Sequence, residues 1–151
     1  MLFEHPIRFK LSSDKAMGIT AGAFDLLHAG HLLMLKEAKD NCDFLIVCLQ
    51  SNPAIDRPLS KTPPIESIFE RYRRLASCAH VDYIIPYDTE EDLLTILKHT
   101  SYKWRFLDEN YRGKEFTGWN YRPEAHFFNE RSHSYSSTSL KERIQKNVRD
   151  S

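Results

Sequence analysis

Two histidines three residues apart stand where a predicted strand gives way to a predicted helix. The segment reads Gly22-Ala23-Phe24-Asp25-Leu26-Leu27-His28-Ala29-Gly30-His31. The start of a helix offers unpaired backbone N–H groups and the positive end of its dipole to phosphate oxygens. Imidazoles at that position add further hydrogen-bond donors, which are stronger when protonated. His28 and His31 are therefore candidate ligands of a phosphate group.

The glycines of this segment favour the same interpretation. Gly22 permits a tight turn after the strand, and Gly30 removes a side chain where a phosphate would approach the backbone. The alternative is a histidine pair that caps the helix and binds nothing. A zinc site is disfavoured, because two histidines at this spacing have no evident third and fourth ligand nearby.

A second cluster of candidate phosphate ligands lies near the C-terminus. Ser136, Ser137 and Thr138 precede Leu140 at a predicted helix start, where a hydroxyl either caps the helix or binds phosphate. Arg131, just upstream, offers a guanidinium fork for phosphate oxygens. For Arg131, as for Arg71, a surface salt bridge is the competing interpretation.

These residues require an alternating scaffold to bring them together. Strands are predicted at 16–20 (with the turn at Gly22), 43–50, 81–86, 103–107 and 125–128. A helix with Leu32, Leu35 and Ala38 on one face is predicted after the first strand, and further helices at 65–78, 90–99 and 136–148. Residues 51–64 and 108–123 read as loops, and residues 1–14 as an N-terminal arm. The pattern predicts one α/β domain over 1–151, Rossmann-like, with a five-stranded parallel sheet and helices on both faces. Ligands of such sheets bind beyond the carboxyl ends of the strands.

Composition narrows the possible partners. Of 151 residues, 21 are Lys or Arg and 21 are Asp or Glu, so bulk charge gives no support to binding of nucleic acid or an anionic membrane. No apolar run approaches the ~20 residues of a membrane span, and the N-terminus lacks the features of a signal peptide, so a cytoplasmic protein is expected. The three cysteines, Cys42, Cys48 and Cys78, are expected to be structural thiols.

The first segment resembles the signature Gly-x-Phe-Asp-x-x-His-x-Gly-His of the cytidylyltransferase-like nucleotidyltransferases, particularly the small glycerol-3-phosphate cytidylyltransferases. Two further elements follow in the family order. Phe69-Glu70-Arg71-Tyr72 is similar to the family's helix arginine, and the segment 131–138 resembles its Arg-Thr-x-Gly-Ile-Ser-Thr-Thr. The resemblance runs from about Met17 to Ile144.

This resemblance implies transfer of CMP from Mg²⁺-bound CTP to a small phosphorylated acceptor, glycerol-3-phosphate-like, with release of pyrophosphate. It implies His28, His31 and Arg131 as catalytic residues. The implied nucleotide-binding residues are Gly22, Ala23, Phe24, Asp25, Gly30, Arg71, Ser136, Ser137 and Thr138. Asp25 is expected to orient the site, with an Asx turn at the strand end as the alternative.

Three departures from the family pattern keep other functions open. Ser134 and Tyr135 replace a Gly-Ile pair, and Asp108-Glu109-Asn110-Tyr111 stands where the family carries a Gly-Asp-Asp-Trp-like stretch. The family's loop lysine has no secure counterpart; Lys61 is nearest and Arg57 second, as ligands of the acceptor or the triphosphate. The alternatives are an adenylyltransferase using ATP and a sugar- or cofactor-phosphate, and a nucleotide-binding regulatory protein without turnover.

Two features of the chain have no assigned part in this chemistry. The aromatic-rich segment 102–128 is expected to form core or dimer surface, with stacking on a base or acceptor as the alternative, and a homodimer is expected. The remaining histidines, His133 included, receive no role, and the sequence identifies no metal ligand.

Overall fold

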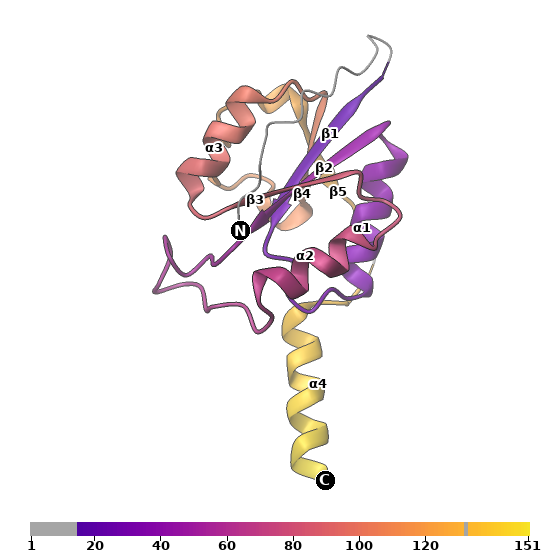
Figure 1. The fold of residues 1–151 in the computed structure, drawn as a ribbon, viewed down its shortest axis with the longest axis vertical. Helices are drawn as coiled ribbons and strands as arrows, with labels where there is room; N and C mark the ends of the chain where they lie inside the picture. Colours follow the sequence, from indigo (N-terminus) through magenta and orange to yellow (C-terminus); the bar gives the residue numbers. More distant parts are fainter. Residues whose placement is uncertain (1–14, 132) are drawn as a thin grey trace.

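The computed structural model describes residues 15–131 and 133–151, so the expected arm at 1–14 lies outside the described residues. Its elements alternate along the chain (Figure 1). In order they are β1 (Met17–Gly22), α1 (Ala29–Asp40), β2 (Phe44–Gln50), α2 (Ile68–Ala76), β3 (Tyr83–Tyr87), α3 (Glu90–His99), β4 (Trp104–Asp108), the 3₁₀ turns η1 (Glu109–Tyr111) and η2 (Pro123–Ala125), β5 (His126–Asn129) and α4 (Ser137–Asp150).

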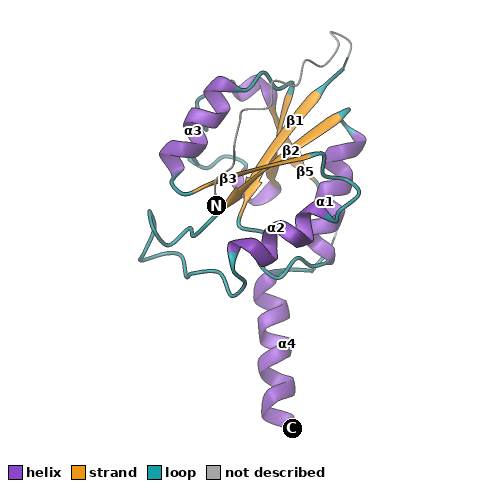
Figure 2. Ribbon diagram, viewed as in Figure 1, coloured by secondary structure: helices purple, strands orange, loops and turns teal. Residues whose placement is uncertain are grey.

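The five strands form one parallel sheet in the order β3-β2-β1-β4-β5 (Figure 2). Strand β1 is central, and its Ile19 is paired with Ile46 of β2 on one side and Arg105 of β4 on the other. Strands β2 and β3 follow on one side of β1, and β4 and β5 on the other, so the topological switch point lies between β1 and β4. This arrangement confirms the predicted Rossmann-like fold and places the expected ligand-binding edge at the carboxyl ends of β1 and β4.

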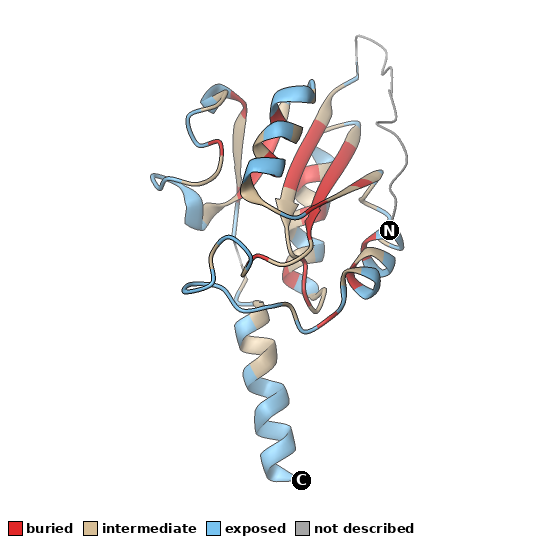
Figure 3. Ribbon diagram, turned by 60° about the vertical axis from the view of Figure 1, so that its left-hand side comes forward, coloured by how far each residue is buried: buried red, intermediate tan, exposed pale blue. Residues whose placement is uncertain are grey.

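Helices cover both faces of the sheet, as predicted. Leu35 of α1 and Leu75 of α2 are fully buried in one cluster with β2 residues, and Leu93 and Leu97 of α3 are buried in a second cluster on the other face. Figure 3 shows the buried residues concentrated in the central strands. The continuous apolar run of β2 follows from this burial on both faces.

Helix α4 departs from this packing. It begins at Ser137, after the N-cap Ser136, and extends away from the sheet (Figure 1). None of its residues is buried, and Ile144 and Val148 of its apolar stripe are 48% and 70% exposed. The expected homodimer, which this stripe would suit, stays a prediction.

Local hydrogen bonds move two predicted element boundaries. The helix expected at 65–78 begins at Ile68, because Ser67 caps it in a reciprocal pair with Glu70. The loop expected at 108–123 contains the 3₁₀ turn η1, and η2 follows directly after Arg122, so the last strand begins at His126 rather than at Ala125. Neither change alters the order of the elements.

The aromatic segment divides between core and surface. Tyr102 and Phe106 are buried, as expected for core residues, whereas Tyr111 and Trp119 are exposed. All three cysteines are free, and burial raises the pKa of the Cys48 thiol to about 12, which fits the expected structural role. Across 15–131 and 133–151, no helix combines the length and the apolarity needed to cross a membrane; a cytoplasmic location stays a prediction.

The contrast between buried and exposed apolar residues predicts two different mutational costs. Leu75→Ala should lower the free energy of unfolding by about 2–5 kcal/mol, because it leaves a cavity beneath α2. Val148→Ala should change it by less than about 0.5 kcal/mol in a monomer. Urea denaturation at several protein concentrations measures both. A concentration-dependent loss in Val148→Ala would contradict the exposure of this stripe.

Candidate active site

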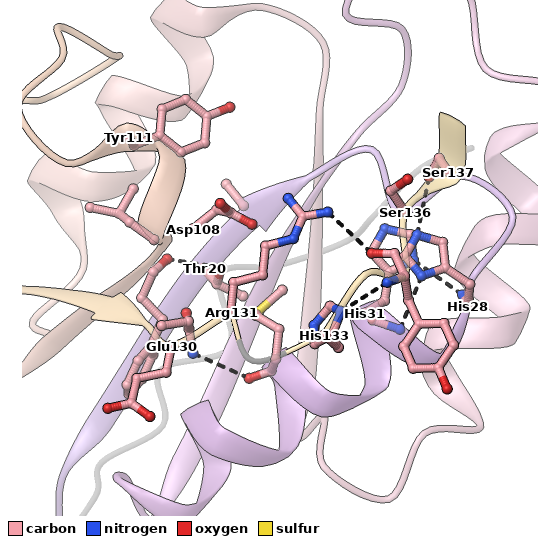
Figure 4. A pocket seen from close by; sticks show the side chains of 17 residues that line it. Thr20, His28, His31, Asp108, Tyr111, Glu130, Arg131, His133, Ser136 and Ser137 are labelled. Atoms are coloured by element: carbon pink, nitrogen blue, oxygen red, sulfur yellow. Dashed lines mark hydrogen bonds between the residues drawn. The ribbon is translucent and has the colours of Figure 1, made fainter. Parts of the chain in front are cut away.

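A cavity of about 270 Å³ opens at the carboxyl ends of β1, β4 and β5, beside the first turns of α1 and α4 (Figure 4). It lies at the predicted edge of the sheet. Its wall brings together residues from both sequence clusters, which are about 100 positions apart in the chain. The lining includes His28, His31, Arg131, His133, Ser136 and Ser137.

The two histidines of the first cluster cap α1 through their Nδ1 atoms. Nδ1 of His28 accepts a hydrogen bond from the backbone N–H of Gly30 (3.1 Å), and Nδ1 of His31 accepts one from the N–H of His28 (3.2 Å). A neutral imidazole that accepts at Nδ1 must carry its proton on Nε2. The capping interactions therefore fix both rings as Nε2–H tautomers.

Both rings contribute to the wall of the cavity. They are stacked with their centroids 3.8 Å apart, and His28 Nε2 lies 3.2 Å from Ser137 Oγ at the start of α4. Capping and phosphate binding use different nitrogens of the same rings. The helix-capping alternative therefore describes these histidines correctly but does not exclude a ligand.

The surroundings keep both imidazoles neutral. Burial, followed by repulsion from the protonated form of His28, lowers the pKa of His31 to about 4, with Asp25 opposing the shift. The pKa of His28 is also lowered, by burial and then by His133 and Arg131. At neutral pH the pair therefore offers N–H donors without a full positive charge, and a bound phosphate would favour protonation.

Gly30 is required by the packing of imidazoles rather than by a bound group. A Cβ at this position would lie 2.9 Å from Cε1 of His28 and 2.9 Å from Cε1 of His133. The space that the sequence suggested for a phosphate is used by these two rings.

The segment after β5 supplies a third imidazole and a guanidinium. His133 lines the cavity, and its Nδ1 accepts a hydrogen bond from the N–H of Tyr135 (3.2 Å). Nη2 of Arg131 donates to the carbonyl of Tyr135 (3.2 Å), which leaves other guanidinium N–H groups for a ligand. Sequence reasoning gave His133 no role, because no spacing linked it to His28; its position inside the 131–138 signature was the available signal.

The three hydroxyls at the start of α4, on the N-cap Ser136 and on Ser137 and Thr138 of the first turn, take different positions. Ser136 Oγ accepts from the N–H of Ser139 (3.0 Å) and caps the helix, while Ser137 Oγ faces His28. Both line the cavity, whereas Thr138 is exposed and does not. The start of α4 thus supports Ser136 and Ser137 as candidate ligands and gives no support to Thr138.

Arg71 braces the loops instead of pointing into the cavity. Its side chain is 1% exposed, and its guanidinium donates to the carbonyls of Glu66, Ala23, Gln50 and Ser51. These bonds occupy four of its five N–H groups. The expected direct contact with the triphosphate is not supported by this geometry; Arg71 joins the ends of β1 and β2 to the start of α2.

The strand-to-helix loop is held by two buried carboxylates. The two carboxylate oxygens of Asp25 accept hydrogen bonds from the N–H groups of Ile65 (2.8 Å) and Glu66 (3.0 Å). Oε1 of Glu66 accepts one from the N–H of Leu26 (2.7 Å). The Asx turn considered for Asp25 is therefore wrong, because its partners lie 40 residues away. Phe24 packs against His31, and both Phe24 (φ 49°) and Leu26 (φ 51°) adopt left-handed backbone.

The remaining predicted residues lie elsewhere. Gly22 and Arg57 line a second cavity on the α3 side of β1, which shares Ala21, Leu107 and Tyr111 with the first. Lys61 is exposed and lines neither, and Ala23 contributes its carbonyl to Arg71. Within the described residues, no three His, Cys, Asp or Glu side chains are grouped as a metal site.

The lowered pKa of His31 predicts a pH-dependent stability. The unfolded chain binds a proton near pH 6.5 and the folded protein only near pH 4. The free energy of unfolding therefore falls as the pH drops from 6.5 to 4, by on the order of 3 kcal/mol from this group. His31→Asn, whose amide oxygen can still cap, should lose this component, and His99→Asn, at an exposed site, should keep it. Parallel denaturation curves for wild type and His31→Asn at all pH values would contradict the assignment.

Comparison with known proteins agrees with the motif and the fold. The cytidylyltransferase-like family model matches residues 19–143. The bifunctional protein HldE of Campylobacter curvus is 32% identical over 124 residues, which cover 77% of this chain and 26% of the relative. HldE of Helicobacter pylori is 33% identical over 131 residues, or 87% of this chain and 28% of the relative. The chain thus spans about a quarter of the length of these relatives.

Solved structures share the fold at low sequence identity. A lipopolysaccharide core biosynthesis protein from Thermoplasma volcanium matches with a TM-score of 0.55 and 20% identity, covering 89% of each chain. A pantoate-beta-alanine ligase from Francisella tularensis, complexed with beta-gamma ATP and beta-alanine, matches with a TM-score of 0.57 and 17% identity over 89% of this chain and 71% of that one. The family model, which spans most of the chain, settles the membership that the histidine motif predicted. The chain belongs to the cytidylyltransferase-like family of nucleotidyltransferases.

Proposed function

We propose that this protein transfers a nucleoside monophosphate from a nucleoside triphosphate to a small phosphorylated acceptor. An oxygen of the acceptor phosphate attacks the α-phosphorus and forms the new P–O bond. The bond from the α-phosphorus to the bridging oxygen breaks, and pyrophosphate leaves with that electron pair. A phosphate dianion is already nucleophilic, so no covalent enzyme intermediate is needed.

The observation that carries this proposal is the pair of Nε2–H groups of His28 and His31 in the wall of the first cavity. Both are held in one tautomer by backbone N–H groups, so their orientation is set before substrate arrives. Donors fixed in this way stabilise charge that develops on the α-phosphate oxygens, because little reorganisation is needed during the reaction.

The start of α4 and the segment before it suit the β- and γ-phosphates. Arg131 and His133 bring donors to the same cavity, and the first turn of α4 points its positive dipole end toward it. In this proposal Mg²⁺ enters with the triphosphate, whose charge it partly neutralises, and belongs to the substrate.

CTP is the proposed donor, on the overall similarity to the small cytidylyltransferases. ATP is the second candidate. Solved structures of the same fold include a bifunctional NMN adenylyltransferase/ADP ribose pyrophosphatase complexed with AMP and a manganese ion, and the ligase complexed with beta-gamma ATP. The stretch from Asp108 to Tyr111 departs from the cytidylyltransferase pattern, and its first and last residues line the first cavity.

Pyrophosphate release should require both substrates. We expect Mg²⁺-dependent release only when a nucleoside triphosphate and a phosphorylated acceptor such as glycerol 3-phosphate are present together. An enzyme-coupled pyrophosphate assay measures it, and kcat/KM with CTP and ATP identifies the donor. Equal hydrolysis of the triphosphate without any acceptor would show that the transferase proposal is wrong.

The two nitrogens of His28 can be separated by substitution. His28→Asn keeps an acceptor near the position of Nδ1 but removes the Nε2–H donor, so kcat should fall about 10²–10³-fold with little change in melting temperature. His28→Gln keeps a donor near the position of Nε2 but removes the cap, so it should cost roughly 1 kcal/mol of stability and less turnover. Calorimetry and the pyrophosphate assay measure the two effects. Near-normal turnover in His28→Asn would contradict the catalytic assignment.

A further inference from the structure

The second cavity, on the α3 side of β1, has a buried guanidinium in its wall. It has a volume of about 270 Å³ and includes Gln50, Arg57, Glu90, Arg105 and Thr117 among its lining residues. Arg105 lies on β4, paired with Ile19 of β1, and is 4% exposed. Burying a charged group at this depth is costly unless other groups compensate its charge.

The protein compensates the charge of Arg105 only in part. Its Nη1 donates to the carbonyl of Thr117 (2.7 Å), and its guanidinium lies 5.3 Å from the centre of the Phe116 ring. Among the described residues no carboxylate forms an ion pair with it. Burial lowers the pKa of this arginine from its ordinary value. Within 15–131 and 133–151, the carbonyl of Thr117 is thus the one hydrogen-bond acceptor of this guanidinium, which leaves N–H groups for a ligand.

The loop over Arg105 is built for this side chain. Gly118 has a φ of +73°, and a Cβ there would lie 2.9 Å from Nη1 of Arg105. The positive φ favours glycine at this position, and a side chain there would displace the guanidinium. Phe116 and Thr117, just before it, supply the ring and the carbonyl that hold the guanidinium in place.

Besides Arg105, three charged residues line the cavity, and they are Arg57, Glu90 and Glu115. The carboxylate of Glu90 is committed to Arg57 (3.0 Å), Gln50 (3.1 Å) and the hydroxyl of Thr117 (2.7 Å). The buried Nε of Arg57 has no hydrogen-bond partner among the described residues. The lining is therefore neutral as a whole, but Glu90 is committed to Arg57, and Glu115 is exposed to solvent and forms no ion pair with Arg105 among the described residues.

We propose that the second cavity receives the acceptor and that Arg105 binds an acidic group of it other than the phosphate that reacts. The inference rests on the proposed transferase function. The reacting phosphate must reach the α-phosphorus beside His28 and His31 in the first cavity. Arg105 lines only the second cavity, beyond the residues that the two cavities share. Its guanidinium is therefore positioned to bind the end of the acceptor that is distant from the reacting phosphate. The acceptor is a phosphorylated carboxylic acid, because a carboxylate matches a guanidinium fork in shape and charge.

Two matched pairs of compounds test this proposal by titration calorimetry, which requires no turnover. The pairs are 3-phosphoglycerate with glycerol 3-phosphate, and 6-phosphogluconate with glucitol 6-phosphate. Each pair differs by a carboxylate in place of a terminal hydroxymethyl group. The wild-type protein is first saturated with α,β-methylene CTP or ATP. In at least one pair the compound with the carboxylate should then bind about 10- to 100-fold more tightly than its hydroxymethyl counterpart. A bisphosphate of the three-carbon chain shows whether a second phosphate serves equally well.

Substitutions assign the preference to Arg105. Arg105→Gln should reduce it to about threefold or less, and Arg105→Lys, which keeps the charge but loses the fork, should retain part of it. Arg73→Gln, on the exposed side of α2, is the matched control and should retain all of it. The affinity for the triphosphate analogue should stay unchanged in every variant.

Three results would overturn the inference. They are the absence of a carboxylate preference in both wild-type pairs, a preference that survives Arg105→Gln, and a loss of triphosphate affinity in place of acceptor affinity. The wild-type comparison decides even if Arg105→Gln does not fold. Lack of pyrophosphate release with any acceptor would instead contradict the transferase function, whatever the calorimetry shows.

Discussion

The arrangement of the first cavity depends on how the opening turn of α1 satisfies its backbone N–H groups. A helix start ordinarily uses a serine, threonine or aspartate for this purpose. Here two imidazoles do so through Nδ1, which orients both rings and determines where their protons lie. Gly30, Phe24 and Ser137 then fit around rings whose positions are already set. The same contacts stabilise the helix and prepare the site.

Sequence reasoning predicted what is periodic or local. Alternating strands and helices implied the parallel sheet, and the β2 run of apolar residues implied a strand buried on both faces. The convergence of His28 with the 131–137 segment followed from the rule that loops at the carboxyl edge of a parallel sheet meet. These features depend on backbone periodicity, which one sequence displays directly.

Long-range side-chain partners could not be predicted in the same way. Arg71 was expected at the triphosphate, but its donors are bound to carbonyls of three separate segments. Asp25 bonds to amides 40 positions away, and His133 joins the histidine pair only through the fold. Burial decides such roles, since a buried guanidinium must satisfy its N–H groups wherever acceptors lie. No local spacing encodes those positions.

Helix α4 is attached to the domain at one end only. Its first turn contributes Ser137 to the cavity, while its later apolar residues Ile144 and Val148 are exposed. The conformational entropy of this helix therefore affects binding at both of its ends. When a nucleotide fixes the first turn, the helix loses conformational entropy along its length. A molecule that covers Ile144 and Val148 also orders the helix and so lowers this cost. Binding at the two ends is then linked, each raising the affinity of the other by the same factor.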